Sequence, residues 1–326
     1  MYTSLGSAVL TSGETMDMGC VLCPDPTFAP LVPQFLAHKP ESCMWHIRRS
    51  VSERLDELET RFYIGRVGDE IITNIMTVES RGAGILGHVF TSVPHRRKGA
   101  CKLLMAEQMG DFRRRGGQCL ILDTGYDTHP YYIYRGFGFE SIAPEAGQMR
   151  YTVVGDDAFA AEWFSAEPVS VVDLAWHHWP AISVMTSFDY GEYLRTVLPP
   201  AFGPYNFEGP FYGLKQRCEE RGDCQCKVLQ GPNGAVLGYA ALQPDVRFHE
   251  EVYVLDLMLW PGAAEHGAAL VSAFDWPKAK VQAYADDASE AKIRALNAAG
   301  FVDEAILRKQ IHRGGKPMDV LVFARE

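Results

Sequence analysis

The sequence predicts two α/β domains in tandem, each built on a mixed sheet. The order of strands and helices in the first half repeats in the second, and an internal repeat of this size indicates two related domains. The chain has 326 residues, 47% of them hydrophobic and 22% charged, so each half can enclose its own core. We expect the domains to span residues 1–158 and 168–326, joined within 155–170.

In the first half, turn residues and apolar spacing define the elements. Strands are predicted over 16–23, 61–67, 70–80, 84–93, 119–125 and 148–154. Helices are predicted over 29–39, 48–59, 98–115 and 131–137. The third is the clearest, because its apolar side chains recur at helical spacing and "RRRGG" ends it with basic residues and glycine.

The second half repeats this order with its own turn signals. Strands are predicted over 169–176, 224–230, 235–243, 252–260, 280–285, 305–311 and 319–324. Helices are predicted over 210–221, 263–274 and 289–301. Both halves are therefore predicted to be α/β.

Composition excludes several function classes. The net charge of −10 argues against nucleic acid or an anionic membrane as a partner. No apolar run approaches the ~18 residues of a membrane span, and the N-terminus lacks the basic region of a signal peptide. We therefore expect a cytoplasmic protein with reduced thiols. The cysteine groups "CVLC" and "CEERGDCQC" lack a second paired cluster, so we expect small buried side chains and no metal site.

The segment "RRKGAC" (96–101) stands where a helix is predicted to start. The first N–H groups of a helix have no partner within it, and the helix dipole adds positive character there. Arg96, Arg97 and Lys98 supply further charge, and Gly99 permits close approach of an anion. The alternative is a solvated basic helix start.

Together with "YRGFGF" further along the chain, this segment resembles the GNAT acyltransferase superfamily. "RRKGAC" matches the motif [QR]-x-x-G-x-[GA] at Arg96 and Gly99, with Cys101 where glycine or alanine is usual. "YRGFGF" matches Y-x-x-x-G-F at Tyr134, Gly138 and Phe139. The resemblance covers most of residues 1–155 and implies mixed, mostly antiparallel sheets flanked by helices.

The resemblance also implies a site for acetyl-CoA. The fourth and fifth strands of this fold splay apart, so that the pantetheine arm can pair with "VFTSV" as an added strand would. The pyrophosphate would lie on the amides of Arg97 to Cys101. The residues expected to bind the cofactor are Phe90, Thr91, Ser92, Val93, Arg96, Arg97, Lys98, Gly99, Ala100, Cys101, Asp127 and Tyr131. For Tyr131, packing in the core is the alternative.

The expected chemistry is attack of an amine on the thioester. A phenol, with a pKa of ~10, can protonate the leaving thiolate, and the motif register favours Tyr134 for this role. An alkyl ammonium must first lose a proton, and the candidate bases are His88, Asp123 and Glu79. A chain of water molecules to solvent is the further alternative.

The second repeat keeps the pattern of the fold and loses the chemical groups. Gly267 aligns with Gly99, but Ala264 replaces the arginine and Glu265 adds negative charge where the pyrophosphate would lie. Leu296 stands at the position of the motif tyrosine. We therefore expect a degenerate C-terminal domain and a working site in the N-terminal one.

These observations predict an N-acetyltransferase that moves an acetyl or other short acyl group from acetyl-CoA to a small-molecule primary amine. The net charge, with Glu79, Asp123 and Asp127, favours an amine that carries further positive charge. A monomer or homodimer is expected. The alternatives are a non-catalytic acyl-CoA-binding or sensing protein, and an acetyltransferase for protein N-termini or lysines.

Overall fold

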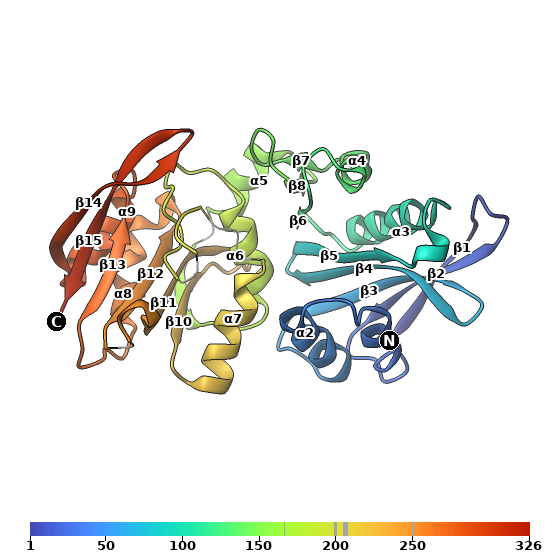
Figure 1. Cartoon of the computed structure of the whole chain (residues 1–326), viewed down its shortest axis with the longest axis horizontal. Coiled ribbons are helices and arrows are strands. Elements are labelled where there is room, and N and C mark those ends of the chain that lie inside the picture. Colours follow the sequence, from blue (N-terminus) through green and yellow to red (C-terminus); the bar gives the residue numbers. More distant parts are fainter. Residues whose placement is uncertain (166, 199–200, 205–207, 250) are drawn as a thin grey trace. The chain divides into compact units, whose positions relative to one another are not determined.

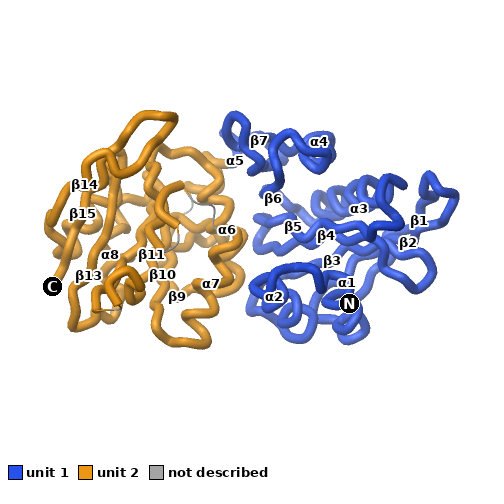
Figure 2. The backbone as a smooth tube through the Cα atoms, viewed as in Figure 1, with its two compact units in different colours: residues 1–159 blue, residues 160–326 orange. Residues whose placement is uncertain are grey.

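The computed structural model describes the whole chain except residues 166, 199–200, 205–207 and 250. The chain divides into two compact units, Met1–Phe159 and Ala160–Glu326 (Figures 1 and 2). Each unit contains one mixed sheet flanked by helices, so the predicted fold class is confirmed. No helix in the described part of the chain is both long enough and apolar enough to cross a membrane.

Unit 1 is built on an eight-stranded sheet with the order β1-β2-β3-β4-β5-β6-β8-β7. Its strands are β1 (Tyr2–Val9), β2 (Thr15–Leu22), β3 (Glu59–Val67), β4 (Glu70–Ser80), β5 (Ala83–Thr91), β6 (Cys119–Asp123), β7 (Glu140–Ser141) and β8 (Gln148–Thr152). Its helices are α1 (Leu31–Phe35), α2 (Glu41–Ser52), α3 (Ala100–Arg114) and α4 (His129–Arg135). Neighbouring strands are antiparallel except β5 and β6, which run parallel.

Helix α3 lies on one face of this sheet and α2 on the other (Figure 1). Four of the five predicted apolar positions of α3 are confirmed, since Leu104, Met105, Met109 and Phe112 are fully buried, whereas Cys101 is partly buried. Burial of each such side chain contributes about 1.5–3 kcal/mol. This packing fixes the start of α3 against the sheet.

The bounds predicted for the second helix are wrong. Helix α2 runs from Glu41 to Ser52 instead of over 48–59. Pro40 stands at its N-cap, and the buried side chains of Met44, Ile47 and Val51 follow at helical spacing. The charged segment after Ser52 contributes no comparable apolar face.

Unit 2 is built on a seven-stranded sheet with the order β14-β15-β13-β12-β11-β10-β9. Its strands are β9 (Ser170–Asp173), β10 (Gln225–Gln230), β11 (Val236–Pro244), β12 (Tyr253–Leu259), β13 (Val281–Ala285), β14 (Val302–Arg313) and β15 (Lys316–Arg325). Its helices are α6 (His178–Thr186), α7 (Pro210–Gln216), α8 (Gly267–Ser272) and α9 (Glu290–Ala298), and α5 (Asp156–Trp163) crosses the boundary between the units. As in unit 1, one strand pair is parallel, here β12 and β13.

Candidate functional site

The parallel strands of unit 1 separate after three residue pairs. Strand β5 pairs with β6 only at Ala83, Gly84 and Ile85, whereas it pairs with β4 as far as Thr91. Among the described strands, the second half of β5 therefore has no partner on the side of β6. The N–H and C=O groups on this edge are available to an extended ligand with amides of its own. We call this opening between β5 and β6 the unit 1 notch.

Helix α3 begins beside this notch with its amides uncapped. Gly99 is the N-cap residue and has φ +88°, in the left-handed region, and no side chain caps the helix. A Cβ added at Gly99 would meet only Leu103 Cδ1, at 4.0 Å. Glycine is therefore favoured here by the backbone conformation and not by lack of space. The exposed amides and the dipole of this 15-residue helix can bind an anion.

A pocket of about 880 Å³ joins the notch to the start of α3. Eight of the predicted site residues line it: Phe90, Thr91, Arg96, Arg97, Gly99, Ala100, Cys101 and Tyr134. Six further residues complete the lining: Val89, His95, Lys102, His129, Pro130 and Ile133. The two motifs thus meet at one cavity, although more than thirty residues separate them.

Four of the residues predicted to bind the cofactor do not line this pocket and make hydrogen bonds within unit 1 instead: Ser92, Lys98, Asp127 and Tyr131. Lys98 Nζ donates to Glu14 Oε2 at 2.9 Å, and Ser92 Oγ lies 3.0 Å from His95 Nδ1. Asp127 accepts a hydrogen bond from the Tyr132 hydroxyl.

Tyr131 is buried, and its hydroxyl lies 2.9 Å from Ser141 Oγ. This agrees with the alternative that it packs in the core. Val93, which also lies outside the lining, is exposed in a short 3₁₀ turn.

Tyr134 projects from α4 into the pocket. It is 7% exposed, and its ring packs edge-on against Phe139 with the centroids 6.2 Å apart. Both residues belong to the Y-x-x-x-G-F motif, so the motif's phenylalanine positions its tyrosine. A phenol held in this way at the wall of a pocket can donate a proton to a bound group.

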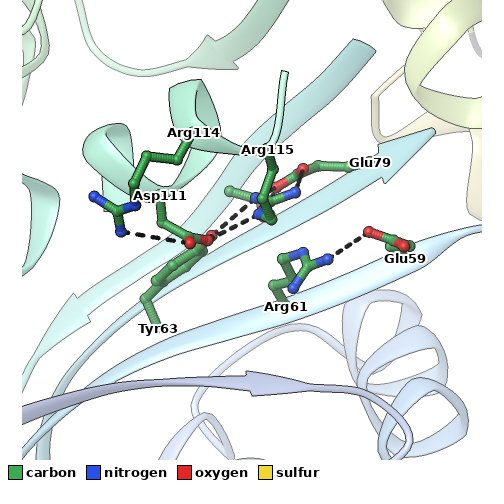
Figure 3. Close-up of polar contacts among 8 residues, drawn as sticks. Glu59, Arg61, Tyr63, Glu79, Asp111, Arg114 and Arg115 are labelled. Carbon is green, nitrogen blue, oxygen red and sulfur yellow. Dashed lines mark hydrogen bonds and ion pairs between the residues drawn. The ribbon is translucent and has the colours of Figure 1, made fainter. Parts of the chain in front are cut away.

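Glu79 is held by Arg115 at the other end of α3. Arg115 donates to both carboxylate oxygens of Glu79, at 2.6 and 2.9 Å, and to Asp111 Oδ2 at 2.9 Å. The Tyr63 hydroxyl donates to the same Asp111 oxygen at 2.7 Å (Figure 3). Because α3 is about 20 Å long, this cluster is remote from the pocket. Glu79 therefore serves the structure of unit 1, contrary to its expected candidacy as a base.

His88 lies at a β-bulge of β5, where its φ is +48°. Its carbonyl oxygen accepts a hydrogen bond from Asn74 Nδ2 at 3.0 Å. Burial, Lys39 and His38 lower the pKa of His88 to about 4. The imidazole is therefore neutral at pH 7 and a weak base. Asp123 lies exposed at the end of β6 and does not line the pocket.

Unit 2 has a corresponding notch, and its own chain fills it. Strands β12 and β13 also pair over three residues, ending at Leu255 and Ala283. Asp256 Oδ1, just beyond, accepts the amide of Val197 at 3.1 Å. Asp286 Oδ2, which follows β13, accepts the amides of Tyr193 and Leu194 at 2.7 and 2.6 Å.

Further contacts hold the segment Tyr193–Val197, which we call the unit 2 plug. Lys292 Nζ donates to the carbonyl oxygen of Leu194 at 2.7 Å and pairs with Glu192. Leu194 and Val197 are buried in an apolar cluster with side chains of β12 and β15. Sequence reasoning missed the plug.

The helix start in unit 2 differs as well. Gly267, aligned with Gly99, has φ −60°, and a Cβ there would lie 2.7 Å from both Ala295 and Leu259. This glycine therefore serves close packing. Glu265 is exposed beside His266, whose Nε2 lies 3.5 Å from it.

No protein-family model matches the chain, and no curated protein matches it. Solved structures do match. Ribosomal-protein-S5-alanine acetyltransferase from Vibrio fischeri is 17% identical, with a TM-score of 0.38, over 49% of this chain and 93% of its own. A GNAT superfamily phosphinothricin acetyltransferase from Sinorhizobium meliloti, in complex with AcCoA, is 18% identical with a TM-score of 0.38, over 49% and 88%.

Spermidine N-acetyltransferase from Vibrio cholerae, in complex with CoA and spermine, is 12% identical, with a TM-score of 0.34, over 48% of this chain and 94% of its own. The solved structures that match therefore include GNAT acetyltransferases, each over about half of this chain.

Proposed function

We propose that unit 1 is a GNAT-type acyltransferase domain that binds acetyl-CoA and transfers its acetyl group, or another short acyl group, to a primary amine of a small molecule. One observation carries this proposal. The unpaired edge of β5, the uncapped start of α3 at Gly99, and Tyr134 all meet at the same pocket of about 880 Å³.

Two features of the pocket support this assignment, one for the pantetheine arm and one for the pyrophosphate of acetyl-CoA. The unpaired edge of β5 at residues 89–91 suits the two pantetheine amides, with the carbonyls of Phe90 and Thr91 already accepting from Thr73 Oγ1 and Arg96 Nε. The amides that open α3, with Arg97 and Lys102 beside them, suit the pyrophosphate. Arg96 takes part through its two terminal guanidinium nitrogens, because its Nε donates to the Thr91 carbonyl at 3.0 Å.

Tyr134 donates a proton to the departing thiolate in this proposal. His88 does not deprotonate the amine in this proposal, since its pKa of about 4 lies far below the ~10 of an alkyl ammonium. Asp123, at the exposed end of β6, and water leading to solvent are the proposed routes for that proton.

Unit 2 is proposed to be the degenerate partner. The plug holds the place in its sheet that corresponds to the unit 1 notch, and its amides are paired with Asp256 and Asp286. A ligand there would have to displace these buried contacts.

Release of free thiol from acetyl-CoA, measured with a panel of amines, tests the proposal. Amine-dependent release that disappears in Tyr134→Phe supports it. Binding of acetyl-CoA without release by any amine would instead indicate an acyl-CoA-binding protein. Release only with peptide N-termini or lysines would indicate a protein acetyltransferase.

A further inference from the structure

Four polar side chains gather on the face of the unit 1 sheet that is covered by α1 and α2. His38 and Lys39 come from the segment between these helices, Asn74 from β4 and His88 from the bulge of β5. The His38 ring lies 4.0 Å from the Phe90 ring, centroid to centroid, and Asn74 Nδ2 donates to the His88 carbonyl. We call these four residues the polar cluster.

The polar cluster adjoins the proposed acetyl-CoA pocket. Phe90 lines that pocket and also packs against His38, so one side chain separates the two. In the proposed function, the pyrophosphate lies at α3 and the pantetheine runs back along β5. The thioester then reaches the bulge at His88, beside the cluster.

The positive charge of the cluster at pH 7 is that of Lys39, because His88 is neutral there. Lys39 is half-buried, and no carboxylate among the described residues lies within 4.0 Å of its Nζ. Burial lowers the pKa of both histidines; Lys39 and Arg96 lower that of His38 further, and Lys39 and His38 lower that of His88 further. A half-buried lysine without a carboxylate partner favours an anion beside it.

Two buried polar atoms of the cluster also lack partners. In the described part of the chain, neither His88 Nε2 nor Asn74 Oδ1 makes a hydrogen bond. Asn74 is only 1% exposed. Buried polar groups are nearly always paired, so unpaired ones beside a pocket indicate atoms that a ligand satisfies. One is an acceptor suited to an amine N–H, and the other is a ring nitrogen able to donate to an anion.

We propose that the polar cluster is the subsite for the acceptor, and that the acceptor is an amine that also carries a carboxylate or phosphate group. This inference rests on the proposed function of unit 1. Lys39 Nζ and His88 Nε2 bind the anionic group, and Asn74 Oδ1 accepts a hydrogen bond from the reacting amine.

The inference reverses the preference that net charge predicts for the acceptor. Net charge acts at long range and is screened by salt, whereas the cluster acts at contact. Of the carboxylates expected to favour a cationic amine, Glu79 is neutralised by Arg115. Asp127 accepts the hydroxyl of Tyr132.

Matched amines test the proposal. Amino acids are compared with their amides, which keep the amine and replace the carboxylate with an uncharged group, and 2-aminoethylphosphonate and 1,3-diaminopropane are assayed beside them. We expect kcat/KM to be at least tenfold higher for an acid than for its amide. The phosphonate shows which anionic group the subsite prefers. Higher kcat/KM for the amides or for the diamine would overturn the inference and leave the proposed function standing.

Lys39→Gln links this preference to the cluster. The ratio of kcat/KM between acid and amide should fall at least tenfold in this variant, mainly through KM of the acid, and Lys39→Arg should restore most of it. Arg113→Gln, which removes an equal charge from the exposed end of α3, should leave the ratio unchanged. An equal fall in both variants would overturn the inference, and so would an unchanged ratio in Lys39→Gln. Absence of thiol release with every amine would instead overturn the proposed function, and the inference with it.

Discussion

Replacement of Gly99 separates charge from backbone strain at the proposed pyrophosphate site. Gly99→Gln and Gly99→Glu place side chains of nearly equal size at a position with φ +88°. A Cβ at Gly99 would meet only Leu103 Cδ1, at 4.0 Å, so neither substitution is excluded by a clash at Cβ. The left-handed conformation costs an L-residue about 1–2 kcal/mol, and both variants share this cost. They should therefore unfold at similar denaturant concentrations, somewhat below wild type.

The two variants should differ in their affinity for CoA. A carboxylate about 5 Å from one pyrophosphate charge opposes binding by about 3 kcal/mol at an effective dielectric constant of 20. Each 1.4 kcal/mol is a factor of ten, so Gly99→Glu should bind CoA at least ~100-fold more weakly than Gly99→Gln. Salt screens exposed charges, so the gap should narrow as ionic strength rises.

Isothermal titration with CoA measures the affinity of each variant and the number of CoA molecules bound per chain. Wild type should bind one CoA per chain, because the unit 2 plug holds the other notch. Equal affinities of the glutamate and glutamine variants would show that no anion binds at the start of α3. A second CoA per chain, or tight binding that survives in Gly99→Glu, would refute the assignment of unit 1 as the acting half.

Three further predictions concern the pocket and the two cores. Tyr134→Phe should lower turnover about 100-fold with CoA affinity nearly unchanged, and single-turnover rates that stay at the wild-type value would remove Tyr134 from the mechanism. Glu79→Gln should lower the free energy of unfolding of unit 1 by about 2 kcal/mol, measured in urea. This is less than the ~3–5 kcal/mol usual for a broken buried ion pair, because Arg115 keeps its bond to Asp111. An unchanged free energy of unfolding would show that the pair does not stabilise unit 1. Burial would raise the pKa of Asp111, but hydrogen bonds from Tyr63 and Arg115 lower it, so its stabilisation is present above the unfolded pKa and lost as pH falls through the folded one. Burial raises the pKa of Asp256, so its contribution is present below the unfolded pKa and lost as pH rises through the folded one. Calorimetric scans between pH 7 and 3 should therefore show unit 1 weakening relative to unit 2, and parallel shifts of both transitions would contradict this.

Much of the fold and part of the proposed site follow from local patterns in the sequence. The spacing of Leu104, Met105 and Phe112 predicts the buried face of α3, and the two motifs predict residues that meet at one pocket. Such patterns are readable because each lies within a single element. Helix α6 was not predicted, because its residues are buried on every side and its sequence therefore has no amphipathic period.

The polar cluster and the plug could not be predicted in this way. The cluster forms only because a bulge in β5 brings His88 to the side of Asn74 and the segment after α1 packs on Phe90. The plug depends on hydrogen bonds between residues 59 to 93 positions apart. Neither feature leaves a periodic signal in the sequence.

The plug also explains how the separated strands of unit 2 can be stable without a bound ligand. Strands that separate expose backbone groups and apolar side chains, which must be satisfied in the folded state. In unit 2, two buried carboxylates accept the amides of Tyr193, Leu194 and Val197, while Leu194 and Val197 supply apolar contacts. Withdrawal of this segment would leave Asp256 and Asp286 buried without these donors, at the desolvation cost of charged groups. The unit 2 plug is therefore part of that unit's core and not a movable gate, and in unit 1 the corresponding edge of β5 remains available to a ligand.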